Sequence, residues 1–190
     1  MESKYSLPYD GGIIMEGTPQ DIIHRYEKIP TSIFNTETLG AEYVADEIVK
    51  AINAHDAAKA NRPFALGLTT GRSPLGLYQQ LVKRYEAKEV SFDNVEVYSL
   101  DEFYPIKTTE QQSRNYRIHE DFINLVDIKP ENVHLIDGTV PTNKITQYCA
   151  EYERMARNID IMVIGMGEQG QIGFNEPGTY AKSVTRLVQL

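Results

Sequence analysis

The stretch FALGLTTGRSPLGLYQQLVKRYE, residues 64–86, decides the fold because it joins a buried strand directly to an amphipathic helix. Phe64–Leu68 is a short apolar run that ends at Thr-Thr-Gly, as expected for a buried strand. Pro74–Glu86 then has the spacing of a helix with one apolar side. The side chains that this helix should turn inward are Leu75, Leu77, Tyr78, Leu81 and Val82. We therefore predict a strand–turn–helix unit.

The alternation of strand and helix repeats on both sides of this unit. A helix should follow Thr36, a residue suited to the N-cap, and its apolar side chains are Leu39, Tyr43, Ile48, Val49 and Ile52. Further helices are predicted at Arg114–Leu125 and Thr142–Arg157. Further strands are predicted at Ser32–Phe34, Val95–Leu100, Val133–Ile136, Ile159–Ile164 and Val184–Leu190. Alternating strands and helices form parallel βαβ units. We therefore predict an α/β fold, an open, doubly wound, mostly parallel Rossmann-like sheet with helices on both faces.

Length, composition and charge bound the class of protein. The chain has 190 residues, of which 41% are apolar and 24% charged, and this fits one domain with a sizeable core. We assign residues 29–190 to this domain. Residues 1–28 show turn signals but no clear period, so we assign them to an N-terminal arm with a short helix over Gln20–Glu27. The net charge of −8 disfavours nucleic acid and membrane surfaces as partners.

Three further features predict the cellular location. Cys149 is the only cysteine, so no internal disulfide can form, which fits a reducing compartment. The first residues, MESKYSLPYDGG, lack the apolar stretch of a signal peptide. No apolar run approaches the roughly 20 residues that a membrane-spanning helix needs. We therefore expect a cytoplasmic protein.

Candidate binding residues lie where the predicted strands end, because ligands of open parallel sheets bind outside the carboxyl ends of the strands. The loops selected by this rule are Thr69–Pro74, Asp101–Tyr104 and Gly165–Gly178. In the first loop, Gly71 allows close backbone approach, and free N–H groups together with the hydroxyls of Thr70 and Ser73 suit an anion. The alternative is a plain strand-to-helix turn with Arg72 in solvent.

In the second loop, Asp101 and Glu102 close a predicted strand. Burial at such an edge raises the pKa of a carboxyl group toward the range useful for proton abstraction. The alternative for this pair is a helix cap or a surface pair.

The third loop contains Gly165, Gly167 and Gly170 at the spacing of the dinucleotide-binding fingerprint. A dinucleotide loop must run into a long helix that holds the pyrophosphate, but Gly173, Pro177 and Gly178 break any such helix. The fingerprint's ribose-binding acid is also missing from 185–190, where it would fall. We therefore disfavour dinucleotide binding.

The chain resembles glucosamine-6-phosphate deaminase, also called the isomerase, with 6-phosphogluconolactonase as a more distant relative. Six motifs in the same order carry the resemblance between about Ile33 and Leu190: LGLTTGRSPLGLYQQLV, VSFDNVEVYSLDEFY, QSRNYRIHEDF, VDIKPENVHLIDGT, IDIMVIGMGEQGQIGFNEPG and TRLVQL. The YEKIPTSIF start and the FYP that follows Asp101-Glu102 are most similar to a long bacterial branch, in which a deacetylase-like domain follows.

This resemblance implies conversion of glucosamine 6-phosphate to fructose 6-phosphate and ammonia, with a phosphorylated aminosugar as the bound partner and no cofactor. The family's proton-shuttling aspartate falls on Asp101, and the glutamate that supports ring opening falls on Glu176. The family's phosphate loop falls on Thr70, Gly71, Arg72 and Ser73. The substrate-binding positions around these groups are Glu102, Gly167 and Gly170.

Two catalytic-site positions depart from the family's pattern. The family's loop carries Asp and His in the order Asp-Gly-His, where this chain has Gln169 and Gln171. An amide has no usable pKa, so Gln171 cannot relay a proton as imidazole does, although it can hydrogen-bond the sugar. Losing one positioned acid–base group typically costs roughly 10²–10⁴ in rate. Catalytic turnover by this chain is therefore an open question at this stage.

The chain is also C-terminally incomplete relative to the family, whose later basic residues for the phosphate belong to a segment after Leu190. The family's allosteric patch falls on Thr179, Tyr180 and Arg186, with Val188 in place of a basic residue. The sequence leaves the oligomeric state open, with a homo-oligomer and a fused deacetylase-like domain among the options.

Two other functions stay open. A non-catalytic sugar-phosphate-binding module is supported by the amides at 169 and 171. A 6-phosphogluconolactonase-like hydrolase fits the fold, although NEPG and the Asp101-Glu102 pair favour the isomerase. His119 and His134 are interpreted as a helix-face and a strand-edge residue. No group of His, Cys, Asp and Glu has metal-ligand spacing, so no metal is expected.

Overall fold

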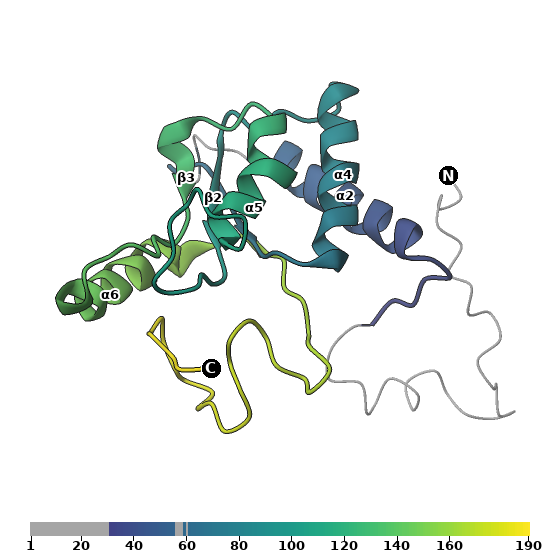
Figure 1. Cartoon of the computed structure of the whole chain (residues 1–190). Coiled ribbons are helices and arrows are strands. Elements are labelled where there is room, and N and C mark those ends of the chain that lie inside the picture. The colour runs from purple at the N-terminus through teal and green to yellow at the C-terminus, as the bar shows by residue number, and fades with distance from the viewer. Residues whose placement is uncertain (1–30, 56–58, 60) are drawn as a thin grey trace, which may run out of the picture.

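Four parallel strands form a sheet in the part of the chain that the structure, a computed structural model, describes: residues 31–55, 59 and 61–190 (Figure 1). The strands are β1 (Phe64–Leu68), β2 (Val95–Ser99), β3 (Val133–His134) and β4 (Ile161–Met162). Their order is β3-β2-β1-β4, and Leu66 of β1 pairs with Val97 on one side and with Ile161 on the other. The chain therefore adds β2 and β3 on one side of β1 and then crosses to add β4 on the other side.

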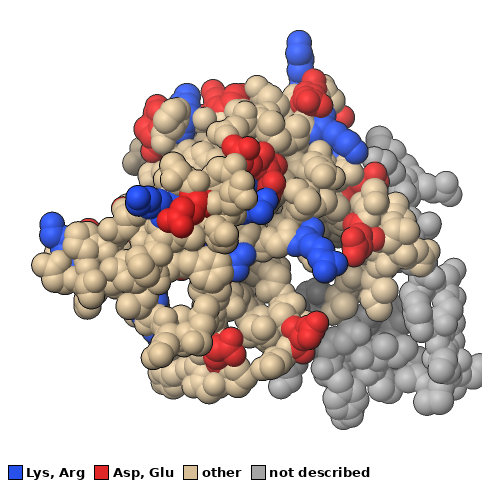
Figure 2. Space-filling model, in the orientation of Figure 1, with Lys and Arg blue, Asp and Glu red and all other residues tan. Residues whose placement is uncertain are grey.

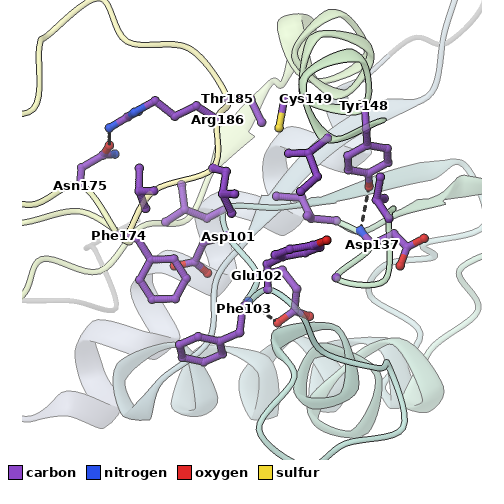
Figure 3. A pocket seen from close by; sticks show the side chains of 18 of the residues that line it. Asp101, Glu102, Phe103, Asp137, Tyr148, Cys149, Phe174, Asn175, Thr185 and Arg186 are labelled. Atoms are coloured by element: carbon purple, nitrogen blue, oxygen red, sulfur yellow. Dashed lines mark hydrogen bonds between the residues drawn. The ribbon is translucent and has the colours of Figure 1, made fainter. Parts of the chain in front are cut away.

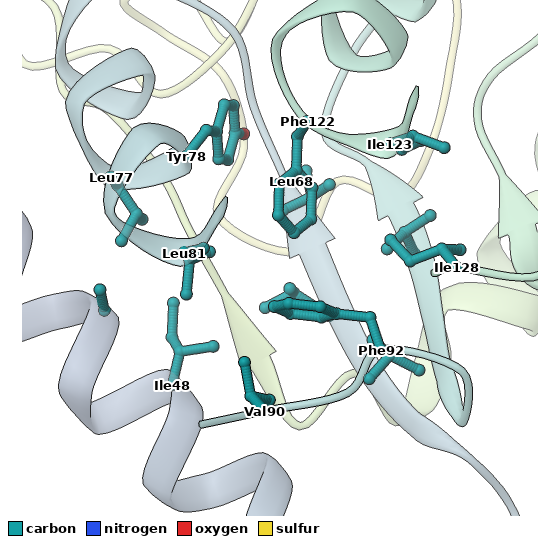
Figure 4. Packing of buried hydrophobic residues seen from close by; sticks show 14 of the residues in the cluster. Ile48, Leu68, Leu77, Tyr78, Leu81, Val90, Phe92, Phe122, Ile123 and Ile128 are labelled. Atoms are coloured by element: carbon teal, nitrogen blue, oxygen red, sulfur yellow. The ribbon is translucent and has the colours of Figure 1, made fainter. Parts of the chain in front are cut away.

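One face of the sheet is covered by the helices α2 (Glu37–Ala54), α4 (Arg72–Glu86) and α5 (Arg114–Asp121) (Figure 1). Every second residue of β1 points into this layer, as the period of a strand requires. Figure 4 shows how the core fills: the ring of Phe122 stacks on Tyr78 at 5.3 Å and meets Phe92 edge-on at 5.2 Å. Such aromatic pairs add to the free energy gained from apolar burial.

The opposite face of the sheet is covered by α6 (Ile145–Met155). Tyr152 of α6 packs against Ala65 and Tyr98, and its hydroxyl accepts a hydrogen bond from the backbone N–H of Ser99 at 2.9 Å. Helices therefore lie on both faces, and the predicted doubly wound α/β fold is confirmed. The arm predicted for residues 1–28, with its helix at Gln20–Glu27, lies outside the described residues.

The starts of the first two described helices follow from local sequence. The hydroxyl of Thr36 accepts a hydrogen bond from the N–H of Leu39 at 3.2 Å, which confirms the predicted N-cap. Helix α4 begins at Arg72, two residues before the predicted Pro74, because proline is tolerated in the first turn of a helix.

The later helical segments are more divided than the periodicity predicts. Non-helical backbone at Phe122, with φ −148° and ψ −61°, separates α5 from a 3₁₀ turn at Ile123–Leu125, whereas the sequence predicts one continuous helix. Helix α6 is flanked by 3₁₀ turns at Thr142–Lys144 and Ala156–Asn158, so the predicted range is right but its ends are not α-helical. A further 3₁₀ turn, Pro130–Asn132, precedes β3.

Two predicted strands are wrong. Val184–Leu190 is irregular and mostly exposed, because its backbone finds no adjacent strand, and the N–H of Thr185 donates instead to the Glu153 carboxylate at 2.9 Å. Ser32–Phe34 is likewise irregular, and the ring of Phe34 packs against Tyr43 at 5.2 Å rather than extending a sheet.

β4 is shorter than the predicted Ile159–Ile164, because its register with β1 pairs only Ile161 and Met162. No helix in the described part of the chain is both long and apolar enough to cross a bilayer.

Candidate functional site

Loops from three strands meet at the carboxyl edge of the sheet. The reversal of strand order between β1 and β4 marks the place where open α/β sheets bind ligands. The loop after β1 carries Thr70–Ser73, the loop after β2 carries Asp101, and the loop after β4 contains the glycine-rich stretch 165–178. The sequence selects the same three loops.

The turn after β1 has a conformation that requires glycine. Gly71 has φ +134° and ψ −176°, a region that other residues adopt only under strain. Gly71 is also the N-cap of α4 and offers no side-chain acceptor, so the first N–H groups of this helix keep their capacity to bind an anion. The buried hydroxyl of Tyr78 accepts from the N–H of Thr69 at 3.2 Å and donates to its carbonyl, which holds the start of the turn.

Asp101 follows β2 and has a largely buried carboxylate, with 13% of its side chain exposed. Burial raises the pKa of Asp101, the neighbouring Arg114 opposes this rise, and the negative charge of Glu102 adds to it. The net upward shift brings the carboxyl closer to the range in which a general base works near neutral pH.

The glycine-rich loop approaches this carboxylate at Gly173. Gly173 has φ +57°, and a Cβ built there would lie 3.2 Å from Oδ2 of Asp101 and 3.3 Å from the Leu100 side chain. Both the backbone conformation and the close contact therefore favour glycine. The loop contacts Asp101 through its backbone rather than through an ionisable side chain.

Glu102 turns away from Asp101 and toward the start of α5. Its Oε1 accepts from the N–H groups of Phe103 and Arg114, at 2.8 and 2.9 Å. Its Oε2 accepts from the hydroxyl of Ser113 at 2.7 Å and the N–H of Asn115 at 2.9 Å. These four bonds occupy the acceptor positions of a carboxylate. The structure thus supports the helix-cap alternative, and we assign Glu102 to positioning α5 rather than to substrate.

The predicted catalytic residues of the third loop lie in a different pocket from Asp101. Gln169, Gln171 and Glu176 line a pocket of about 420 Å³ together with Gly170. Within this loop, Oε1 of Gln171 accepts from the N–H of Gln169 at 3.0 Å. The N–H of Gly167 donates to the carbonyl of Gln171 at 2.8 Å, so the predicted glycine positions shape the turn itself.

A larger pocket of about 650 Å³ lies beside Asp101 (Figure 3). Asp101, Phe174 and Arg186 are among its lining residues, and it shares Asn175 and Ser183 with the smaller pocket. The turn from Thr70 to Ser73 lines neither of these two pockets. In the described chain, Asp101 therefore shares neither pocket with the turn, with Gln171 or with Glu176.

The residues predicted to form an allosteric patch are likewise divided. Thr179 and Tyr180 line the smaller pocket, whereas Arg186 lines the larger one. A hydrogen bond of 3.0 Å from the Arg186 guanidinium to Oδ1 of Asn175 connects the two pockets.

Sequence reasoning missed Arg114, the side chain that joins the first two loops. Its Nη1 donates to the hydroxyl of Thr70 at 2.7 Å, and its Nε lies 3.7 Å from Oδ1 of Asp101. The rings of Phe103 and Phe174 lie against the guanidinium, at 4.9 and 5.5 Å from ring centroid to Cζ. One signal could have found it: a cation in the first turn of a helix opposes the helix dipole and therefore needs a local reason.

The histidines in the described site region have structural partners. The Nδ1 of His119 lies 3.0 Å from the carbonyl of Asn115, and the ring of His134 packs against Tyr98 at 5.0 Å. Among the residues that the structure describes, His, Cys, Asp and Glu form no group of three or more that could hold a metal ion.

Comparison with known proteins assigns the chain to a family. The family of glucosamine-6-phosphate isomerases/6-phosphogluconolactonase matches residues 35–173, so the chain belongs to this family. A glucosamine-6-phosphate deaminase of Dictyostelium discoideum is 37% identical over 164 residues, which cover 83% of this chain. A glucosamine-6-phosphate deaminase-like protein of Bacteroides thetaiotaomicron is 36% identical over 174 residues, which cover 90% of this chain.

A solved structure of a monomeric glucosamine-6-phosphate deaminase is similar with a TM-score of 0.72 and 28% identity, over 79% of this chain and 60% of that chain. The matched region is 61% of the Dictyostelium protein and 26% of the Bacteroides protein. The chain thus spans only part of the length of the relatives it matches.

Proposed function

We propose that this chain is an aminosugar-phosphate isomerase/deaminase domain that converts glucosamine 6-phosphate to fructose 6-phosphate and ammonia. The observation that carries the proposal is Asp101, a largely buried carboxylate at the end of β2, which one guanidinium, that of Arg114, links to Thr70 of the Thr70–Ser73 turn. A base next to an anion-binding turn suits an enzyme that moves a proton on a sugar phosphate.

The turn would hold the phosphate group. It offers the hydroxyls of Thr70 and Ser73, the uncapped N-terminus of α4 and the exposed Arg72. Local donors are needed because the chain carries a net charge of −8. On the face that Figure 2 shows, basic side chains lie scattered among acidic ones rather than gathered in one patch.

Asp101 would then move the proton. Its carboxylate removes the proton from C2 of the ring-opened sugar and returns it to C1, which converts the aldose into a ketose-level imine at C2. Addition of water to this imine releases ammonia and leaves fructose 6-phosphate. The raised pKa of Asp101 supports this role, because a stronger base abstracts a carbon-bound proton more readily.

Gln171 and Glu176 would contact the sugar during ring opening. The amide can hydrogen-bond a ring oxygen or a hydroxyl but cannot relay a proton. We therefore expect slow turnover, lower by roughly 10²–10⁴ than with an imidazole at this position.

A non-catalytic sugar-phosphate-binding module is the second candidate. The observation in its favour is the hydrogen bond from the backbone N–H of Gln169 to Oε1 of Gln171, which uses the Gln171 side chain to hold the loop where an acid–base group would otherwise lie. Lactonase activity is the weaker alternative, because no observation at Asp101 favours it over isomerisation.

One pair of assays separates these candidates. Ammonia release from glucosamine 6-phosphate is measured beside direct calorimetric binding of the same sugar, with Asp101→Asn as the control. Release that depends on Asp101 supports the enzyme, whereas binding without release supports the module. Absence of both would overturn the proposed substrate class.

The cellular context of this function is also a proposal. We propose a cytoplasmic protein in which residues 1–28 form an arm and a further, deacetylase-like domain belongs to the same polypeptide. The Bacteroides relative supports a longer polypeptide, since the matched region is 26% of its length. Ultracentrifugation of the natural protein tests whether it forms a homo-oligomer.

A further inference from the structure

Arg114 belongs to helix α5, yet its side chain contacts the loops that follow three strands. It hydrogen-bonds Thr70 after β1, pairs with Asp101 after β2 and lies against Phe174 after β4. Phe103 covers the guanidinium from the second loop. The three loops that sequence reasoning selects therefore meet at one cation that it did not select.

The backbone of Arg114 is anchored to the loop that it contacts. Glu102 accepts hydrogen bonds from the N–H groups of Arg114 and Asn115, at 2.9 Å each. Glu102 is the sequence neighbour of Asp101. Its carboxylate binds the backbone of Arg114, and the Arg114 side chain in turn reaches Asp101, so these contacts form a closed path. This closed path fixes the distance between the guanidinium and Asp101.

The position of Arg114 is unfavourable unless these contacts compensate for it. It occupies the first residue of α5, where a cation opposes the helix dipole. Its Nε is buried without a hydrogen-bond partner, and at 3.7 Å the Asp101 oxygen is too distant for a full bond. A small shift of Asp101 would satisfy this donor.

We infer that Arg114 is a positioning residue that couples the proton-transferring carboxylate to the anion-binding turn, by holding Asp101 and the Thr70 hydroxyl on one guanidinium. This inference rests on the proposed function for the roles of Asp101 and the turn. The coupling itself is a property of the ligand-free chain and can be measured without turnover.

The direction of the hydrogen bond between Arg114 and Thr70 leaves the Thr70 hydroxyl free to donate to an anion. Oγ1 of Thr70 accepts from Arg114, so its own proton points elsewhere and can be donated to a phosphate oxygen. The Arg114 guanidinium would then donate to the Thr70 hydroxyl, and this hydroxyl would donate to the phosphate. Both hydrogen bonds involve a charged group, and each polarises and strengthens the other.

The effect on Asp101 is electrostatic. The charged groups that act on its carboxylate are Arg114 from α5 and Glu102 from its own loop, while Gly173 and Leu100 pack against it without charge. Arg114 opposes the rise in pKa that burial and Glu102 cause. Without Arg114 only the raising influences remain, so Asp101 should hold its proton to higher pH.

The test is a set of variants of the full chain, read by carbon-13 NMR titration of the Asp101 carboxyl and by calorimetric binding of inorganic phosphate. Asp101→Asn assigns the signal. Arg114→Met should raise the pKa of Asp101 and weaken phosphate binding about tenfold. Arg114→Lys keeps the positive charge but loses the planar guanidinium, which can face Asp101 and Thr70 at once. It should therefore leave the pKa of Asp101 close to that of the unaltered chain, while phosphate binding is weakened as in Arg114→Met.

Two further variants separate coupling from damage to the fold. Thr70→Val, a near-isosteric change, should weaken phosphate binding while leaving the Asp101 pKa in place. Arg117→Met removes an exposed cation of the same helix and should change neither. If Arg114→Met is unfolded by circular dichroism, the Lys and Val variants carry the test.

An Asp101 pKa unchanged in Arg114→Met, or phosphate binding unchanged in both Thr70→Val and Arg114→Lys, would overturn the inference. Failure of the unaltered chain to release ammonia counts against the proposed function alone, since neither readout here depends on catalysis.

Discussion

At the scale of single residues, Asp101 combines burial with a cationic neighbour. The carboxylate is protected from water, yet Arg114 at 3.7 Å keeps its pKa from rising as far as burial alone would raise it. Because its pKa is raised, this carboxylate is a stronger base than an exposed aspartate.

Replacement of Asp101 tests this role. Asp101→Asn should lower ammonia release by roughly 10²–10⁴, because the amide cannot accept the proton. In the unaltered chain, kcat/KM should fall on the acid side around a pKa above that of an exposed aspartate, since only the ionised form is a base. A rate that stays constant down to the pKa of an exposed aspartate would show that Asp101 is not the base.

Gly173 provides a second test at this scale. Gly173→Ala should destabilise the chain by about 1–2 kcal/mol through its positive φ and should also displace Asp101, because the new Cβ would lie 3.2 Å from Oδ2. Gly178→Ala is the matched control, with φ +93° and no atom within 4 Å of the new Cβ. Chemical denaturation and the NMR signal of the Asp101 carboxyl check both; equal effects of the two variants on that signal would contradict the contact.

What the sequence reveals about the site depends on distance along the chain. Asp101, Thr70 and Ser73 are predicted because each directly follows a strand whose end is visible in the pattern. Arg114 is not predicted, because its contacts depend on how α5 folds back onto the sheet, and no local pattern encodes that return. Glu102 is predicted only as an alternative, since a carboxylate beside a base and a carboxylate at a helix start look alike in sequence.

At the scale of elements, a side-chain ion pair adds to the backbone hydrogen bonds that hold β4 to β1. The guanidinium of Arg62, before β1, makes two hydrogen bonds of 2.6 Å to Asp160, before β4, and the N–H of Ala65 donates to the same carboxylate at 2.8 Å. The hydrogen bonds and charge of Arg62 hold the pKa of Asp160 below its ordinary value. This carboxylate supports a strand that itself pairs only two residues.

Asp160→Asn should therefore reduce the free energy of unfolding at neutral pH by about 1–2 kcal/mol, a figure discounted for the partial exposure of both side chains. The pKa is lower in the folded state, so the stabilisation is present above the unfolded pKa and is lost as pH falls through the folded value. Urea unfolding should show the two proteins converging in acid. Glu131→Gln, at an exposed carboxylate, is the control; an undiminished gap in acid would exclude the ion pair as the cause.

The helices were predictable from local sequence, whereas the strands were less so because a strand forms only where it can pair with another strand. Thr36 predicts the start of α2, and the apolar spacing in the sequence predicts both α2 and α4. Val184–Leu190 has the composition of a strand but no adjacent backbone in the described chain, so propensity alone gave the wrong element. The same reason shortens β4, whose apolar run extends beyond its register with β1.

At the scale of the whole molecule, the separation of the two pockets bears on turnover. Asp101 lines one pocket, and Gln169, Gln171 and Glu176 line the other. Among the described residues, the two pockets share only Asn175 and Ser183, so Asp101 and Glu176 do not act on one cavity in this arrangement.

Restoring the acid–base pair tests whether the amides limit the rate. In a chain extended to the length of its relatives, Gln169→Asp combined with Gln171→His should raise ammonia release, by up to roughly 10²–10⁴. Each single variant serves as a control, because the imidazole needs the carboxylate to orient it. No gain in the double variant would place the limitation elsewhere in the pocket.

The central claim, that Asp101 takes a proton from a sugar phosphate, is tested most directly by incubating the chain with glucosamine 6-phosphate in deuterated water. The proton held by Asp101 exchanges with solvent before it returns, so proton NMR should report deuterium at C2 of the recovered glucosamine 6-phosphate and at C1 of the fructose 6-phosphate, even if ammonia is released slowly. We predict incorporation with the unaltered chain and none with Asp101→Asn. Equal incorporation by both proteins, or none by a chain that binds the sugar, would contradict the account.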